Sequence, residues 1–105
     1  MPKARADVHQ LLQELSGYGQ RVYFNPPESL KMQYPCIVYS RVNLGALHAD
    51  NFPYFRYDTY TVTHIYQKES ESSLSDRLAL ESGFSFDRNY IADNLRHDVF
   101  TYKIY

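Results

Sequence analysis

Histidines are the residues best suited to catalysis or metal binding, and their spacing in this chain favours neither. The chain has four of them: His9, His48, His64 and His97. Metal sites read from sequence usually place ligands two to four residues apart on one strand or helix, and no two of these histidines have that spacing. Asp50 follows His48 and Asp98 follows His97, so each pair offers the parts of a carboxylate-oriented base. A surface imidazole beside an acid is far commoner, and the sequence predicts no catalytic residue.

The other chemically reactive groups also favour structural roles. Cys36 is the single cysteine, so it excludes an intrachain disulfide and a multi-cysteine zinc site. It lies between Pro35 and Ile37 in an apolar run, where a buried and inert thiol is expected. His64 alternates with tyrosine and valine as a sheet residue does, and His9 is expected near the exposed side of a helix. The four glycines form no phosphate-binding loop. We therefore expect no enzymatic activity, no metal site and no cofactor.

Composition and charge exclude two further classes of function, nucleic-acid binding through phosphates and membrane association. The chain has 105 residues and a net charge of −1, so it lacks the excess of positive charge with which proteins usually bind nucleic-acid phosphates. No apolar run approaches the roughly 20 residues that span a bilayer, so no membrane association is expected. The unusual feature is aromatic: 11 tyrosines and 6 phenylalanines. Tyrosine favours strands and contact surfaces, because its ring is apolar while its hydroxyl seeks a partner.

The hydrophobic pattern predicts two helices and five strands. One apolar stripe indicates a helix over residues 5–17, formed by Val8, Leu11, Leu12 and Leu15. A second, short helix is expected from Ser73, as its cap, to before Gly83. Strands are predicted at residues 21–24, 36–42, 55–66, 84–90 and 97–105. This is one α+β domain over residues 1–105, with a mainly antiparallel or mixed sheet of four to five strands and two helices packed on one face.

Alternation within the strands predicts which side chains share a face. In the third strand these are Tyr60, Val62, His64 and Tyr66, and in the fourth they are Phe84, Phe86, Arg88 and Tyr90. The tripeptide Ala-Asp-Asn occurs at residues 49–51 and 92–94, each time before a strand-like run. Because Asp-Asn is ordinary turn chemistry, we interpret both occurrences as turns rather than as a repeat.

Three stretches, taken in order, resemble a known family. They are Pro-Pro-Glu-Ser-Leu-Lys-Met-Gln-Tyr-Pro-Cys-Ile-Val-Tyr at residues 26–39, Ala-Asp-Asn-Phe-Pro-Tyr at 49–54, and Phe-Asp-Arg-Asn-Tyr-Ile-Ala-Asp-Asn-Leu-Arg-His-Asp-Val-Phe-Thr at 86–101. In this order the chain resembles the small tail-completion or head–tail joining proteins of long-tailed bacteriophages, often labelled minor capsid or tail terminator proteins. The resemblance covers nearly the whole chain, and the last stretch is the most specific. Residues 68–82 follow the family least, so no contact of its second helix is carried over.

The resemblance implies a virion structural protein without catalysis. Such proteins assemble as a ring, usually of six copies, where the tail tube meets the head or its connector, and they cap tail growth or join the tail to the filled head. The implied partners are other copies of the chain, the tail tube and the head connector proteins. The implied location is the head–tail junction of the virion, after synthesis in the cytoplasm of the host bacterium.

A ring contact joins two different patches of each subunit, and the polar loop at residues 43–53 can reach a neighbour. We therefore predict subunit or partner contacts at Asp50, Asn51, Tyr54 and Tyr57, where turn formation and sheet packing are the alternatives.

Two other functions remain open at this stage. A small aromatic-rich module that stacks the bases of single-stranded nucleic acid on its tyrosines is the main alternative, although no direct sequence-specific nucleic-acid binding is expected. A small hydrolase or transferase that uses His97 or His48 is the third.

Overall fold

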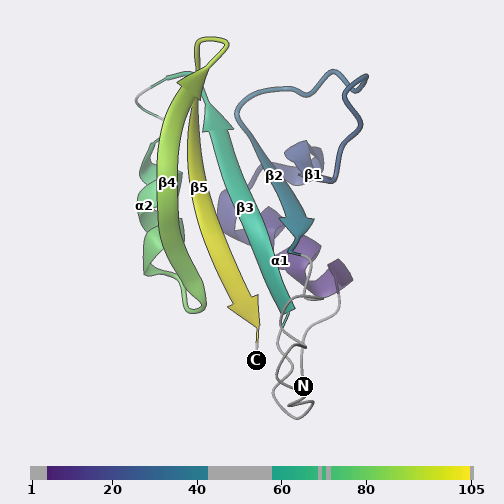
Figure 1. The fold of residues 1–105 in the computed structure, drawn as a ribbon, viewed down its shortest axis with the longest axis vertical. Coiled ribbons are helices and arrows are strands. Elements are labelled where there is room, and N and C mark those ends of the chain that lie inside the picture. The colour runs from purple at the N-terminus through teal and green to yellow at the C-terminus, as the bar shows by residue number, and fades with distance from the viewer. Residues whose placement is uncertain (1–4, 43–57, 69, 71, 105) are drawn as a thin grey trace.

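The structure, a computed structural model, describes residues 5–42, 58–68, 70 and 72–104. Along the chain these residues form α1 (Arg5–Ser16), η1 (Gly19–Arg21), β1 (Val22–Phe24), β2 (Cys36–Arg41), β3 (Asp58–Tyr66), α2 (Ser73–Leu80), β4 (Phe84–Ala92) and β5 (Leu95–Ile104). The strands form one sheet in the order β1-β2-β3-β5-β4, in which only β1 and β2 run parallel. Both helices lie behind this sheet (Figure 1). The predicted α+β domain with a mixed sheet and two helices on one face is confirmed.

The helix boundaries agree closely with the sequence pattern. α1 ends one residue before the predicted limit, at Gly17, which has a φ of 70° and donates its N–H to the carbonyl of Gln13. Glycine suits this position because a left-handed residue at a helix end strains any side chain. The cap of α2 was predicted wrongly, because the N-cap residue is Ser72 and Ser73 is the first helical residue. The Ser72 side chain makes no capping hydrogen bond.

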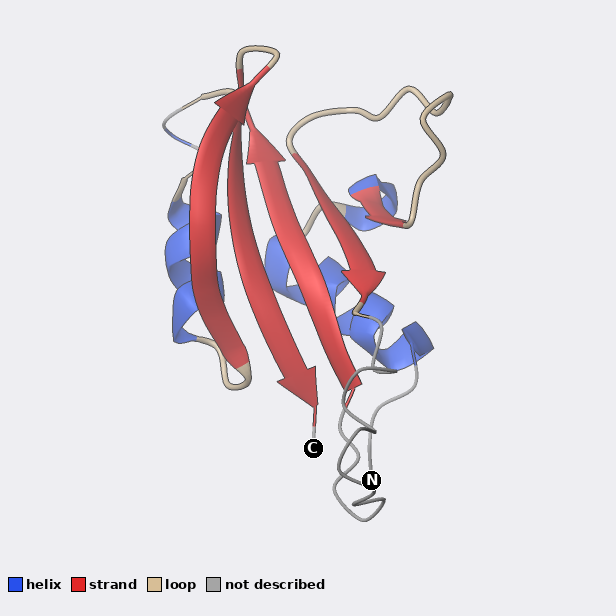
Figure 2. Cartoon of the chain, in the orientation of Figure 1, coloured by secondary structure: helices blue, strands red, loops and turns tan. Residues whose placement is uncertain are grey.

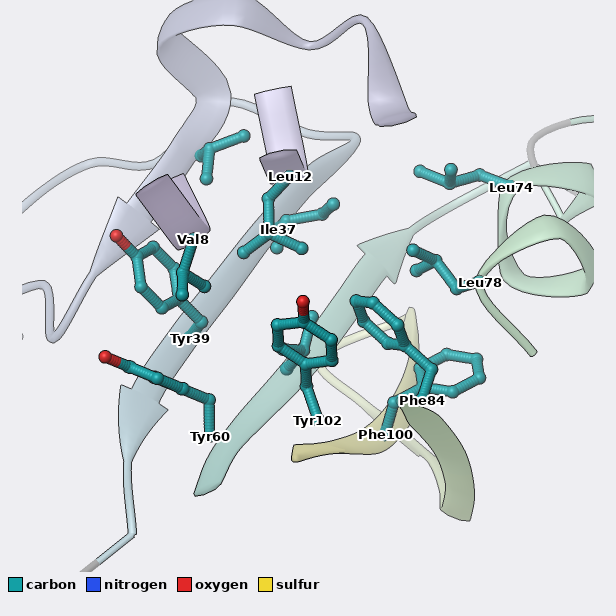
Figure 3. Packing of buried hydrophobic residues seen from close by; sticks show 12 residues of the cluster. Val8, Leu12, Ile37, Tyr39, Tyr60, Leu74, Leu78, Phe84, Phe100 and Tyr102 are labelled. Carbon is teal, nitrogen blue, oxygen red and sulfur yellow. The ribbon is translucent and has the colours of Figure 1, made fainter. Parts of the chain in front are cut away.

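The core lies between the helices and the sheet (Figure 3). α1 contributes Val8 and Leu12, and α2 contributes Leu74 and Leu78. The sheet contributes a layer with many aromatic rings: Val22, Ile37, Tyr39, Tyr60, Val62, Phe84, Phe100 and Tyr102. Several of the tyrosines are therefore core residues, and the excess of aromatic residues is in part a packing feature.

A β-bulge in β4 changes which side chains share a face. The register with β5 shifts between Phe86 and Arg88, so that one extra residue lies in β4. Phe84 and Phe86 pair with Tyr102 and Phe100 on the helix side, whereas beyond the bulge Asn89 takes that side. The prediction that Arg88 and Tyr90 share a face with the two phenylalanines was therefore wrong, because an inserted residue reverses the alternation.

The connections at the two ends of β4, from α2 and to β5, rely on left-handed residues. Asp93 and Asn94, with φ values of 54° and 62°, form the two-residue turn from β4 to β5. This geometry is typical of the tight turns that match the twist of a hairpin, and it confirms a turn at residues 92–94. Gly83, with a φ of 89°, precedes β4. Figure 2 shows these connections at opposite ends of the long hairpin.

The second Ala-Asp-Asn occurrence is therefore a turn, while the first, at residues 49–51, lies outside the described residues. The same holds for the start of the predicted strand at 55–66, of which β3 covers Asp58–Tyr66. Among the residues that the structure describes, no helix is long and apolar enough to cross a membrane.

Candidate functional site

One row of paired residues crosses all five strands and contains two buried polar side chains, His64 and Asp98. In order across the sheet it is Val22, Ile37, His64, Asp98 and Asn89, each paired with the next. Its apolar half lies under α1, and its polar half lies near the first turns of α2. His64 is fully buried, and Asp98 is 7% exposed. Polar groups buried to this degree need hydrogen-bond partners.

Four side chains around His64 supply these partners in one continuous chain. The Tyr18 hydroxyl lies 2.7 Å from His64 Nε2, and Ser75 Oγ lies 2.8 Å from His64 Nδ1. The Ser75 hydroxyl donates to Asp98 Oδ2 at 2.5 Å, and the Tyr66 hydroxyl donates to the same oxygen at 2.8 Å. The Tyr66 ring also stacks on the His64 imidazole, with ring centres 4.6 Å apart. The network joins the segment after α1, strands β3 and β5, and α2.

The hydrogen bonds fix where the protons lie. The Ser75 hydroxyl has one proton, which it donates to Asp98, so its oxygen must accept from His64. His64 therefore carries a proton on Nδ1. A neutral imidazole then leaves Nε2 as an acceptor for the Tyr18 hydroxyl, and no buried charge on the ring is needed.

This order of groups differs from that of a hydrolytic triad. In a triad the imidazole lies between the hydroxyl and the carboxylate and takes the hydroxyl proton. Here the hydroxyl of Ser75 lies in the middle, and the nitrogen of His64 that faces it already carries a proton. The arrangement is suited to holding α2 and residue 18 against the sheet. It offers no activated nucleophile.

A groove opens beside this network, between α2 and the bulged part of β4. Its volume is about 490 Å³, and it is lined by Tyr66, Ser72, Ser75, Asp76, Ala79, Phe86, Asn89, Asp98 and Phe100. A smaller hollow of about 130 Å³ shares Tyr66, Asn89 and Asp98 with it and extends along β4 to Ile91 and Arg96. Because of the bulge after Phe86, the short side chain of Asn89 lies on the helix side of β4 and lines the groove, where regular alternation would place Arg88.

The lining of the larger groove combines negative charge with aromatic surface. Asp76 and Asp98 are the two acidic residues among its described lining residues, which include no lysine, arginine or histidine. Phe86 is 53% exposed and packs edge-on against Phe100. Carboxylates beside aromatic faces favour cationic side chains over anions.

The reactive residues considered from the sequence have structural surroundings. Cys36 is fully buried, and burial raises the pKa of its thiol to about 12, with Arg21 opposing this shift in part. The expectation of a buried thiol is confirmed. His97 and Asp98 lie on opposite faces of β5, since they are adjacent in a strand. His97 stacks instead on Tyr90, with ring centres 4.6 Å apart.

His9 differs from the expectation of an exposed position. It is half-buried, and its Nδ1 atom lies 2.7 Å from the hydroxyl of Tyr39, a core residue of β2. This contact gives the buried tyrosine hydroxyl a partner, which an apolar residue in α1 would not.

The predicted contact residues lie outside the part of the chain that the structure describes. These are Asp50, Asn51, Tyr54 and Tyr57, and His48 lies outside it as well. Within the described residues, no three histidine, cysteine, aspartate or glutamate side chains gather as a metal-binding group.

Sequence reasoning placed His64 on the apolar face of its strand but missed its pairing with Asp98 and Ser75. Two polar residues on the apolar faces of different strands were the available signal. Antiparallel pairing of β3 and β5 brings them together, and that register is fixed by the fold.

Comparisons with known proteins give no relative: no family model, no curated protein and no solved structure matches this chain.

Proposed function

We propose that the chain is a non-enzymatic virion protein of a long-tailed bacteriophage. It acts at the head–tail junction, in tail completion or head–tail joining, by assembling into a ring with other copies of itself. Its partners there are the tail tube and the head connector proteins. The phage assignment rests on the sequence resemblance, and the assembly is supported by the shape of the sheet.

The observation that supports assembly is the unlike character of the two sheet edges. At one edge, β4 is nine residues long, and in the described part of the chain it pairs only with β5. It exposes Phe86, Tyr90 and Ile91, the last at 72%. An exposed long edge strand with apolar side chains is a template for association, and natural monomers usually protect it.

The opposite edge has a different surface. β1 has three residues, and the connection at residues 25–35 extends beyond it (Figure 1). A subunit with two different edges suits a head-to-tail contact, in which one edge of each copy meets the other edge of the next. Such contacts close into a ring when the rotation between copies permits it.

The hydrogen-bonding order of the buried network agrees with a protein that works by assembly. The Ser75 hydroxyl accepts a hydrogen bond from His64 and donates its own proton to Asp98, so both protons are already used within the network. The expected absence of catalysis remains part of the proposal.

The alternative, stacking of single-stranded nucleic acid, would use the sheet face away from the helices. The exposed aromatic ring of Tyr90 on that face is already stacked on His97. The positions next to this pair are Ile65, Val99 and Arg88, and farther along the face lie Thr59, Thr61, Thr63, Thr101 and Lys103. Base-stacking sites usually need several open rings together with positive charge, so this face supports nucleic-acid binding less well than the edges support assembly.

The assembly is tested by native mass spectrometry and sedimentation velocity of the full chain over a wide concentration range. The proposal predicts a closed ring, and Ile91→Lys is expected to weaken it because a charge enters an apolar edge contact. Gln10→Lys, which adds the same charge to an exposed position of α1, is the matched control and should leave the ring intact. Equal effects of the two variants would contradict a contact through β4.

A further inference from the structure

The groove beside α2 and the connection at residues 25–35 have complementary surfaces. Among the described residues that line the groove, Asp76 and Asp98 are acidic and none is basic, and Phe86 supplies an apolar wall. Asp98 is 7% exposed, and the hydroxyls of Tyr66 and Ser75 both donate to one of its oxygens, Oδ2. Hydroxyls leave the negative charge of the carboxylate in place, so the groove favours a cation.

The connection carries an exposed basic residue next to an exposed apolar one. Leu30 is 43% exposed, and its N–H donates to the carbonyl of Pro27 at 3.0 Å, which closes a turn. Lys31 follows and is exposed. Two residues later, the N–H of Gln33 donates to the Tyr23 hydroxyl at 3.2 Å, which ties the connection to β1. Leu30 and Lys31 are therefore presented on an anchored turn.

These two surfaces lie at opposite edges and at the same end of the sheet. The connection enters β2 at Cys36, which pairs with Ile65 in β3. Ile65 pairs with His97, which pairs with Tyr90 in β4, one residue from Asn89 of the groove. In Figure 1 the connection extends away from β1, while α2 flanks β4 at the other side. Within one copy the width of the sheet separates them, whereas two copies placed edge to edge can bring them together.

We propose that the groove of each subunit receives the turn at residues 27–31 of the neighbouring copy in the ring. Lys31 places its ammonium group near Asp76 and Asp98, and Leu30 packs against Phe86. This inference rests on the proposed assembly and deepens it, since it names the two patches that meet. The contact is head-to-tail, because the groove and the turn belong to different edges.

A charge swap tests the contact in the full chain. Lys31→Glu alone and Asp76→Lys alone each place like charges together, and each is expected to weaken subunit association about ten-fold or more. The double variant again pairs opposite charges at positions 31 and 76, while Asp98 still faces residue 31, so it should recover part of the lost affinity. Asp76 and Lys31 are both exposed, so neither change is expected to disturb folding, and circular dichroism checks this.

Glu28→Gln is the control within the same turn, because it also changes an exposed charge. It should leave association unchanged or stronger. Rings that tolerate both single reversals would overturn the inference and leave the proposed assembly standing. A double variant no better than either single variant would overturn it as well. A wild-type chain that forms no ring under any condition would contradict the proposed assembly, and the contact with it.

Discussion

His64 and Asp98 are paired directly across β3 and β5, and one hydroxyl, that of Ser75, hydrogen-bonds to both. This bridge connects α2 to two central strands through a buried polar contact. The same carboxylate borders the groove between α2 and β4. The network that holds α2 in place therefore also shapes the surface to which we assign the subunit contact.

Removing the bridging hydroxyl should lower stability. Ser75→Ala leaves the His64 Nδ1–H buried without an acceptor and removes one donor from Asp98. Unsatisfied buried polar groups cost about 1–3 kcal/mol, and this range is expected for the loss in the free energy of unfolding. Urea unfolding measures it. Ser73→Ala, an exposed change in the same helix, should cost about 0.5 kcal/mol or less, and a similar loss in both variants would contradict the bridge.

The proton on His64 can be observed directly. The network requires a proton on Nδ1, and with a neutral imidazole Nε2 accepts from the Tyr18 hydroxyl. Nitrogen-15 NMR of the ring distinguishes the two neutral tautomers and should show a protonated Nδ1 and an unprotonated Nε2. A proton on Nε2 alone would mean that Ser75 donates to His64 and that the assigned direction of the chain is wrong.

The turn before β4 should not accept a side chain. A Cβ atom at Gly83 would lie 2.9 Å from the Lys103 carbonyl oxygen and 2.9 Å from a ring carbon of Tyr102, and φ at this residue is 89°. Gly83→Ala is therefore expected to cost more than the roughly 1–2 kcal/mol of left-handed strain alone. Gly17→Ala is the control, because φ there is 70° with open space around the site. Thermal or urea unfolding should rank Gly83→Ala as clearly the less stable variant, and equal losses would contradict the steric account.

The thiol of Cys36 should be unreactive in the folded protein. Burial raises its pKa to about 12, so almost no thiolate exists at neutral pH. Alkylation by iodoacetamide should be slow in native buffer and fast in denaturant. Rapid labelling of the native chain would show that the strand opens readily or that the thiol is exposed.

The same shift makes stability depend on pH. The thiol holds its proton in the folded state up to a pKa of about 12 but loses it near 9 once unfolded, so the folded state binds more protons between these values. The contribution of the protonated thiol to the free energy of unfolding is complete below pH 9. It decreases as the pH rises and is lower by about 2 kcal/mol at about pH 10.5. Cys36→Ala should lack this part of the alkaline loss, and the same alkaline slope in both proteins would contradict it.

Much of the fold follows from local patterns. The apolar stripe of α1, the β-branched run of β2 and the alternation in β3 each determine one element and its buried face, and the structure places them within a few residues of the prediction. The turn at Asp93 and Asn94 follows from the tolerance of these residues for left-handed backbone.

Local sequence patterns could not predict the candidate site, and the reason is physical. The groove depends on a bulge at residue 87, and an inserted residue leaves no clear mark in a run of alternating residues. The network depends on the register between β3 and β5, which the whole sheet sets. The contact residues predicted in the loop at 43–53 and beyond it lie outside the described residues, and they remain predictions.

The head–tail function is tested most directly by removing the coding sequence from the phage that carries it and imaging the particles by electron microscopy. The account predicts filled heads and tails that remain separate, or tails that fail to stop at one length. Purified chain added to such an extract should restore joined, infectious particles, and Ile91→Lys should restore fewer. Normal, infectious particles in the absence of the gene would contradict the account.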